Sequence, residues 1–239
     1  MSGHSKWSTI KREKGAKDAK RGAIFTRIGN QIAIAARSGI DPTMNSALSM
    51  AIEKAKQANM PAANIQRAID RVADKNAAVL EEATYEAMGP GGIGIIIETA
   101  TDNKNRTFPD VRNALTKNGG RIADAGSVAF QFTRKGVINV TATGEDALLT
   151  VLDAGAEDAV EEEGETIVYT DQKDLAKVRT AIIEAGLEIT GAELQYVPNN
   201  PVVIDDAEVA QKVFKVLDAL DELDDVTNVH TNADITVEL

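Results

Sequence analysis

Residues 136–198 carry the sequence pattern that most constrains how this chain can fold. Short β-branched runs predict strands there, and apolar residues at helical spacing predict helices between them. The predicted elements are strands 137–141, 156–161, 166–170 and 192–197 with helices 145–154 and 172–185. Their order, strand–helix–strand–strand–helix–strand, is that of a ferredoxin-like domain. A turn with two prolines, Pro198 and Pro201, closes this segment.

The first third of the chain has a helical period and predicts three helices. Each helix is marked by apolar residues on one face: Ile24, Ile28, Ile32 and Ala35 in the first, Leu48, Ile52 and Ala55 in the second, and Ile65, Ile69 and Val72 in the third. The first helix is expected to end near Gly39. Asn59-Met60-Pro61 separates the other two, and Pro61 suits the first turn of a helix. This pattern predicts a small three-helix domain.

The segments on either side of residues 136–198 are predicted to share one domain. The segment before residue 136 is predicted to contain strand 93–100, helix 107–118 and strand 127–132. The segment after residue 198 is predicted to contain a long helix and then strand 234–239. The apolar face of that helix carries Val209, Val213, Leu217, Leu220 and Leu223. One helix and one short strand cannot bury both of their faces, so we expect them to complete the sheet that begins at Ile93. The predicted fold is multidomain α+β. The predicted domains are 1–78 (basic arm and helices), 79–135 plus 199–239 (discontinuous α+β), and 136–198 (inserted, ferredoxin-like).

Charge is unevenly distributed along a chain whose net charge is -11. Residues 1–75 contain 14 Lys or Arg and 6 Asp or Glu, whereas residues 76–239 contain 12 and 31. A cationic end attracts a polyanion. The basic start of the chain is either a solvated tail or a nucleic-acid-binding arm, and its Trp favours the arm because an indole ring can stack on a base. The candidate contacts are Lys6, Trp7, Lys11, Arg12, Lys14, Lys17, Lys20 and Arg21.

A second group of basic residues lies between residues 102 and 135, among Asn and Gly residues that predict turns. Arg and Lys side chains in loops, with glycine N–H groups nearby, suit phosphate oxygens. A balanced surface is an equal alternative, because residues 76–135 hold seven basic and seven acidic side chains. The candidate phosphate contacts are Lys104, Arg106, Lys117, Arg121, Arg134 and Lys135.

The sequence offers little that predicts catalysis. It has no Cys, which excludes thiolate chemistry, and no apolar run approaches the length of a membrane span. His4 and His230 are far apart, and Glu161–Glu163 are expected to form a solvated edge and not a metal site. Gly89–Gly94 matches G-x-G-x-x-G, but it precedes a strand, whereas a dinucleotide-binding motif follows one. We therefore expect no cofactor and no metal. A hydrolase or cofactor-dependent enzyme is the alternative of another class.

Short motifs run in order from residue 3 to residue 136. They include Gly3-His-Ser-Lys-Trp7, Asp18-Ala-Lys-Arg21, Asn59-Met-Pro61, Gly89-Pro-Gly-Gly92, Thr101-Asp-Asn-Lys-Asn-Arg-Thr107, Lys117-Asn-Gly-Gly120, Gly126-Ser-Val128 and Arg134-Lys-Gly136. Together they resemble the signature of the YebC family. Because this signature begins at Gly3, with no room for a presequence, we expect a bacterial cytoplasmic protein.

The resemblance implies a helical N-terminal domain and a ferredoxin-like domain inserted in another α+β domain, in agreement with the pattern above. It also implies no enzymatic activity and no cofactor. Family members are usually described as probable transcriptional regulators that bind DNA, whereas a related mitochondrial activator of cytochrome oxidase translation acts through the ribosome. We expect a monomeric, non-enzymatic, DNA-binding regulator of gene expression. The alternative is a translation factor that binds rRNA in the ribosome. Ribosomal or transcription proteins are further expected partners, and no membrane is.

Overall fold

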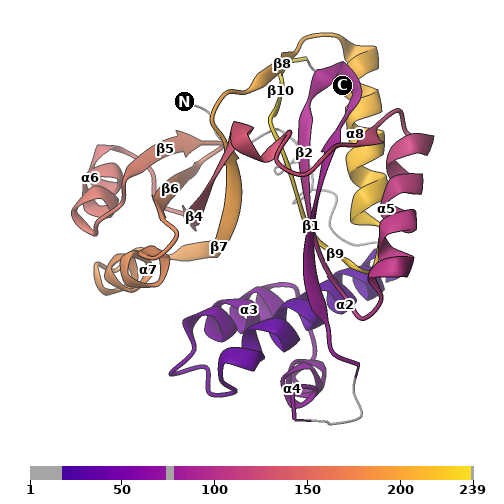
Figure 1. Ribbon diagram of the computed structural model, residues 1–239. Helices are drawn as coiled ribbons and strands as arrows, with labels where there is room; N and C mark the ends of the chain where they lie inside the picture. Colours follow the sequence, from indigo (N-terminus) through magenta and orange to yellow (C-terminus); the bar gives the residue numbers. More distant parts are fainter. Residues whose placement is uncertain (1–17, 74–77, 238–239) are drawn as a thin grey trace. The chain divides into compact units, whose positions relative to one another are not determined.

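The computed structural model describes residues 18–73 and 78–237 (Figure 1). These residues fall into two compact units. The smaller unit consists of residues 132–199, and the larger unit is built from the described residues before and after that segment. None of the helices in the described ranges has the length and apolar character that crossing a membrane requires.

Three helices form the N-terminal part of the larger unit: α2 (Asp18–Ala35), α3 (Ser46–Gln57) and α4 (Ala62–Asp70), with a short 3-10 helix at Ala36–Ser38. Their apolar faces meet in one core, where Ile32 and Leu48 are fully buried. Asn45 caps α3 by accepting the N–H of Leu48. The three predicted helices are confirmed. Val72, however, lies beyond the end of α4 and is 39% exposed, so its assignment to the buried face was wrong.

The second part of the larger unit is a sheet covered by two helices. Strands β1 (Glu81–Met88), β2 (Gly94–Thr101), β3 (Arg121–Ile122) and β9 (Val226–Thr231) form an antiparallel sheet in the order β3-β1-β2-β9. Helices α5 (Lys104–Lys117) and α8 (Ala207–Asp221) lie side by side on one face of this sheet (Figure 1). Ile97 of β2, Leu115 of α5 and Leu217 of α8 are fully buried in the core between them.

The C-terminal segment completes the sheet that begins near Ile93, as expected, but through a strand that the sequence pattern did not predict. This strand is β9, which pairs with β2. The predicted last strand is β10 (Ala233–Ile235), and it pairs in parallel with β8 (Val202–Ile204).

The glycine-rich motif at residues 89–94 forms the tight connection between β1 and β2. Pro90–Gly92 is a 3-10 turn in which Gly91 and Gly92 have φ values of 74° and 78°. A Cβ atom on Gly91 would lie 2.7 Å from the side chain of Ile204. The prediction of a turn with positive φ is confirmed, and the motif leads into a strand, not into the helix that would receive a pyrophosphate.

The smaller unit is ferredoxin-like, as predicted. It contains β4 (Phe132–Val140), α6 (Glu145–Asp153), β5 (Asp158–Glu162), β6 (Glu165–Asp171), α7 (Leu175–Glu184) and β7 (Ile189–Pro198). The antiparallel sheet has the order β5-β6-β4-β7. Gly136 lets α7 approach β4 closely, because a Cβ there would collide with the Thr170 hydroxyl and lie 2.8 Å from Cβ of Leu175.

The strand predicted at 127–132 is wrong for most of its length. Residues 129–131 form a 3-10 helix, and β4 begins at Phe132. The carboxylate of Glu86 accepts the N–H groups of Gly126, Val128 and Ala129 at 2.5–2.7 Å. These N–H groups therefore cannot take part in a sheet, and the loop is pinned to β1 instead.

Candidate nucleic-acid interface

Most of the predicted basic arm lies outside the described residues. Lys6, Trp7, Lys11, Arg12, Lys14 and Lys17 precede residue 18. Lys20 and Arg21 belong to the first turn of α2, but their side chains also lie outside the described part of the structure. These eight contacts therefore stay predictions.

Arg106 is held by the carboxylate of Asp225, a residue 119 positions later in the chain. Its Nη2 donates to Oδ2 of Asp225 at 2.8 Å, and the hydroxyls of Thr107 and Thr101 donate to the same oxygen at 2.6 and 3.1 Å. Burial tends to raise the pKa of the Asp225 carboxyl, but the hydrogen bonds from Thr107 and Arg106 outweigh it, so the pKa is lowered. The guanidinium of Arg106 thus already has a carboxylate partner that joins α5 to the start of β9.

Lys104 is also paired, but loosely. Its Nζ lies 2.6 Å from Oε2 of Glu81, and both side chains are at least half exposed. The hydrogen bond and the charge of Lys104 lower the pKa of Glu81, and Glu81 raises the pKa of Lys104 in return. Exposed ion pairs of this kind contribute little and exchange partners readily. Lys104 and Arg106 are equally exposed, at 50% and 52%, and each has a carboxylate partner in the described structure.

The next two candidates flank the turn after α5. Lys117 is in the last turn of that helix and Arg121 is in β3, and both are exposed. Within the described ranges neither side chain has an ion pair. They are the most available cations of the second basic group in the larger unit.

Arg134 and Lys135 belong to the smaller unit, so the structure does not assemble the six candidates into one described surface. Arg134 stacks over the ring of Tyr196, with its guanidinium carbon 5.6 Å from the ring centroid. Nζ of Lys135 lies 3.2 Å from Oε2 of Glu157. Residues 132–199 contain five Lys or Arg and 14 Asp or Glu, a net charge that repels phosphate.

Within residues 22–73 the charge balance is the reverse, with six Lys or Arg and three Asp or Glu. Two of these cations hold the helices to the rest of the larger unit. Nη1 of Arg27 lies 3.3 Å from Oδ1 of Asp221, and Arg37 donates to the carbonyl of Leu80. The sequence-based list did not include any of the six. The only signal for them was the excess of basic residues over 1–75.

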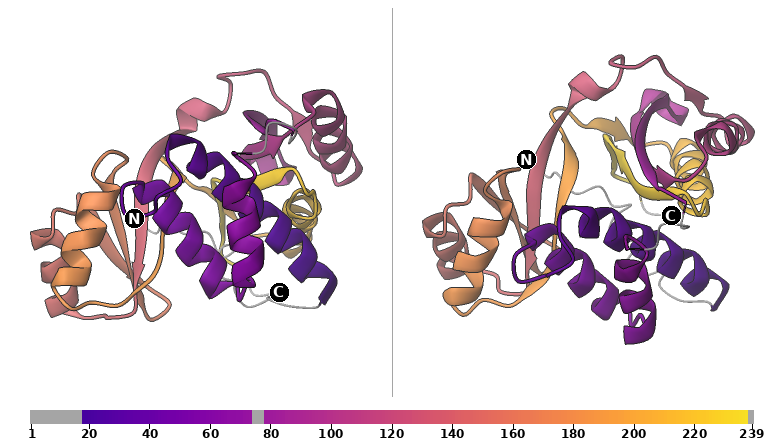
Figure 2. Two further views of the ribbon diagram at one scale, coloured as in Figure 1. Left: turned by 90° about the horizontal axis from the view of Figure 1, so that it is seen from below. Right: turned by 60° about the horizontal axis from the view of Figure 1, so that its bottom comes forward.

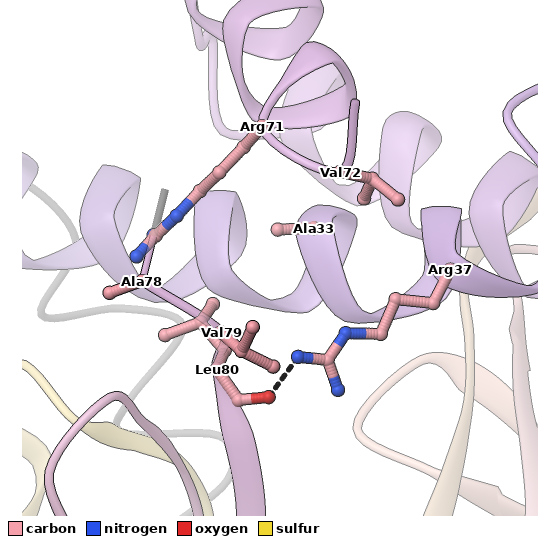
Figure 3. Close-up of a pocket in the computed structure, with 7 residues that line it drawn as sticks. All are labelled: Ala33, Arg37, Arg71, Val72, Ala78, Val79 and Leu80. Carbon is pink, nitrogen blue, oxygen red and sulfur yellow. Dashed lines mark hydrogen bonds between the residues drawn. The ribbon is translucent and has the colours of Figure 1, made fainter. Parts of the chain in front are cut away.

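A cavity of about 100 Å³ lies between α2, the end of α4 and the residues that lead into β1 (Figure 3). Arg37 reaches Leu80 at one end, and at the other Nη1 of Arg71 lies 3.4 Å from Oδ1 of Asn30. The described lining holds two guanidinium groups beside apolar side chains: Ala33, Arg37, Arg71, Val72, Ala78, Val79 and Leu80.

The described residues do not bring together a set of metal ligands. Across 18–73 and 78–237, no three His, Asp or Glu side chains converge as metal ligands would. His230 pairs with Glu98 of β2 at 3.1 Å, mostly buried within the sheet. This contact fits a structural role for His230.

Comparison with known proteins identifies the family. A family model described as the TACO1/YebC second and third domain matches residues 80–233, and a model described as the TACO1/YebC protein N-terminal domain matches residues 5–75. This chain belongs to the TACO1/YebC family. The N-terminal family model ends and the second one begins between α4 and β1. This boundary coincides with the change from the three helices to the sheet.

Relatives in the TACO1/YebC family match along almost the whole chain. A probable transcriptional regulatory protein of Moorella thermoacetica is 47% identical over 242 residues, covering 98% of this chain and 96% of the relative. Another protein of that name, from Treponema denticola, is 48% identical over 240 residues, covering 98% and 97%. The crystal structure of a conserved hypothetical protein from Aquifex aeolicus has a TM-score of 0.86 at 40% identity and covers 93% of both chains. The relatives' names support a regulatory role.

Proposed function

We propose that this protein is a non-enzymatic regulator of transcription that binds DNA through its N-terminal third. The observation that carries the proposal is the separation of charge. The cations of residues 1–75 have few carboxylates near them in the sequence, whereas residues 132–199 are strongly acidic. The N-terminal third is therefore the part of the chain best suited to approach a phosphate surface. The names of the relatives, probable transcriptional regulatory proteins, agree with this role.

Binding to DNA of this kind rests mainly on phosphate contacts, and so it should depend strongly on salt. Near physiological salt we expect the protein to prefer a promoter fragment over random duplex by less than about a hundredfold, because the acidic unit finds no positive surface on bare DNA. Nucleic acid crosslinked to the protein in cells should be enriched in promoter DNA. Recovery of rRNA without promoter DNA would refute the transcriptional proposal.

A ribosome-bound translation factor is the second candidate, and one observation favours it. The 132–199 unit carries 14 acidic side chains and needs a basic partner to contribute to binding. Ribosomal proteins are basic, and rRNA can accept the N-terminal third at the same time. Under this alternative the protein should sediment with ribosomes after nuclease has removed the DNA. Strong promoter selectivity with no ribosome association at the same salt would exclude it.

A further inference from the structure

The connection between α3 and α4 is a rigid turn of four residues, Ala58–Pro61. The N–H of Asn59 donates to the carbonyl of Lys56 and the N–H of Met60 to that of Ala55, both at 2.9 Å. Asn59 has a φ of 56°, in the left-handed region. A left-handed residue at the end of a helix, together with these two hydrogen bonds, defines a Schellman motif. Pro61 then begins α4 by accepting the N–H groups of Asn64 and Ile65. The direction of α4 is therefore set by the turn.

Helix α4 has one buried face and one exposed polar face. Ile65 and Ile69 pack into the helical core with Met60 from the turn. The opposite face presents Ala63, Gln66, Arg67 and Asp70 to solvent. Among the described residues, the polar groups on this face are paired along the helix: Gln66 donates to Asp70 at 2.8 Å and Arg67 to Asn64 at 3.4 Å.

Neither α2 nor α3 covers the exposed polar face of α4. Figure 1 views α4 nearly end-on while α2 and α3 run across the view, so α4 crosses both steeply. Figure 2 (left) shows the same helices from below, in indigo to purple. Two helices joined by a short turn, with the second helix crossing and exposed, are the elements of a helix-turn-helix.

We propose that α3 and α4 form a helix-turn-helix in which α4 enters the major groove of duplex DNA, with Gln66 and Arg67 contacting base edges. This inference rests on the proposed DNA-binding function and assigns its reading element. With nine residues, α4 is about 13 Å long, and the major groove is about 12 Å wide and accepts one helix.

The side chains on the exposed face have the chemistry that base reading requires. Gln pairs with the N6 and N7 groups of adenine, and Arg pairs with O6 and N7 of guanine. Ala63, one turn before Arg67, is small enough to let the backbone approach or to contact a thymine methyl. Lys56, exposed in the last turn of α3, is placed to reach a phosphate beside the groove.

Duplex DNA is the occupant that these features favour. Residues 22–73, which include most of the three helices, have an excess of cations. The acidic side chains of the smaller unit belong to a different part of the sequence, residues 132–199. The major groove of an RNA duplex is deep and too narrow for side chains on a helix to read. A helix with Gln and Arg on its open face therefore matches B-form DNA.

The test uses the full-length protein. Its preferred site is first selected from a library of random duplexes, and the affinity ratio between that site and a scrambled duplex is measured at fixed salt. Gln66→Ala and Arg67→Ala are compared with two matched controls on exposed positions, Gln211→Ala in α8 and Arg112→Ala in α5. Alanine favours helices, so thermal melting should show all four variants folded.

We expect Gln66→Ala and Arg67→Ala each to lower the affinity ratio by about five- to tenfold, as loss of a base contact does, with little change for the controls. A ratio unchanged in both α4 variants, or a wild-type ratio near one, overturns the recognition helix while DNA binding itself stands. Failure of the wild-type protein to bind any duplex instead overturns the proposed function. If the two variants lose affinity only for structured RNA, α4 contacts RNA and the inference is wrong.

Discussion

Two segments of the larger unit carry similar polar and basic side chains, and the structure gives them different partners. In the segment that opens α5, Arg106 is bound by Asp225 and Lys104 by Glu81. In the α3–α4 pair, Arg67 contacts only the amide oxygen of Asn64, and no carboxylate pairs with Lys56 within the described ranges. A count of Lys and Arg in the sequence therefore does not measure the charge available to a phosphate, because carboxylates distant in the sequence can neutralise it.

The largest expected effect comes from removing the basic arm. Deleting residues 1–17 leaves α2 intact and removes five Lys or Arg. Duplex DNA affinity should fall about a hundredfold or more at low salt, and the log–log salt slope should become shallower by about 4–5. A filter-binding or anisotropy titration over several salt concentrations measures both.

The matched control replaces the same five residues, Lys6, Lys11, Arg12, Lys14 and Lys17, by Gln in the full-length chain. It should reproduce the loss if charge is responsible. The melting temperature should be nearly unchanged in both proteins. Undiminished affinity in either protein would mean that the basic arm does not contribute to DNA binding.

Asp225→Ala should be the most destabilising change among the contacts that hold the start of α5. It removes the acceptor shared by Arg106, Thr107 and Thr101, and its carboxylate is only 16% exposed. The free energy of unfolding should fall by about 2–3 kcal/mol in a urea titration, since hydrogen-bonded groups lose a charged partner. Asp224→Ala, at the exposed neighbouring position, should cost less than about 0.5 kcal/mol. Equal effects of the two changes would mean that Asp225 does not hold the segment.

Glu86→Gln should destabilise the loop at residues 123–131 by about 1–2 kcal/mol, because a neutral amide is a weaker acceptor for three N–H groups. Burial tends to raise the pKa of Glu86, but the three backbone hydrogen bonds lower it below its ordinary value of 4.5. The native carboxylate therefore stabilises the fold above that pH, and this contribution is lost as the pH falls toward the lowered pKa.

The measurement for Glu86 is a series of denaturant titrations between pH 7 and pH 3. The difference between wild type and Glu86→Gln should be largest near neutral pH and should shrink on acidification. Glu82→Gln, on the same strand and exposed, should show no such convergence. A difference that stays constant with pH would show that the negative charge is not what holds the loop.

Asn59→Val should destabilise the helical part by about 1–2 kcal/mol, because a β-branched residue is strained at a φ of 56°. Asn59→Gly should be nearly neutral, since glycine adopts this conformation without strain. Thermal melting separates the two variants. Equal stability of the Val and Gly proteins would mean that the turn is not rigid, and would weaken the assignment of α4 to a helix-turn-helix.

The smallest effect is expected at Lys104. Because Glu81 already partners its ammonium group, Lys104→Ala should change duplex DNA affinity by less than about twofold. Lys56→Ala removes a cation that has no carboxylate partner among the described residues, and it should lower the magnitude of the salt slope by about one. If Lys104→Ala lowers the affinity more than Lys56→Ala does, Lys104 leaves Glu81 when DNA binds. The ion pairs of the free protein would then not indicate which cations contact phosphate.

Much of the fold could be predicted because its signals are local. The helical faces marked by Ile32, Leu48 and Ile65, and the order of elements between Val137 and Val197, depend on residues close together in the sequence. Strand β1 (Glu81–Met88) was missed because Glu and Ala dominate it, and it becomes a strand by pairing with the apolar β2. The domain boundaries at residues 78, 135 and 198 stay predictions.

The interface was less predictable for a physical reason. The basic composition pointed to residues 1–75, but the partners of Arg106 and Lys104 depend on tertiary contacts. Asp225 lies 119 residues from Arg106, so nothing in the local sequence indicates that the two side chains meet. No local pattern singles out Gln66 and Arg67, because the role proposed for them depends on the turn at Asn59, which sets the direction of the helix that carries them.

The two ends of the smaller unit meet at one place. Phe132, at the start of β4, lies opposite Pro198, at the end of β7, and the Thr133 hydroxyl donates to Oδ1 of Asn199 at 2.6 Å. Facing residues of antiparallel strands are only about 5 Å apart. The chain therefore enters and leaves the smaller unit at two points that lie close together. A short linker can bridge that gap. We therefore expect that the acidic unit can be removed or exchanged without changing the order of the elements in the larger unit.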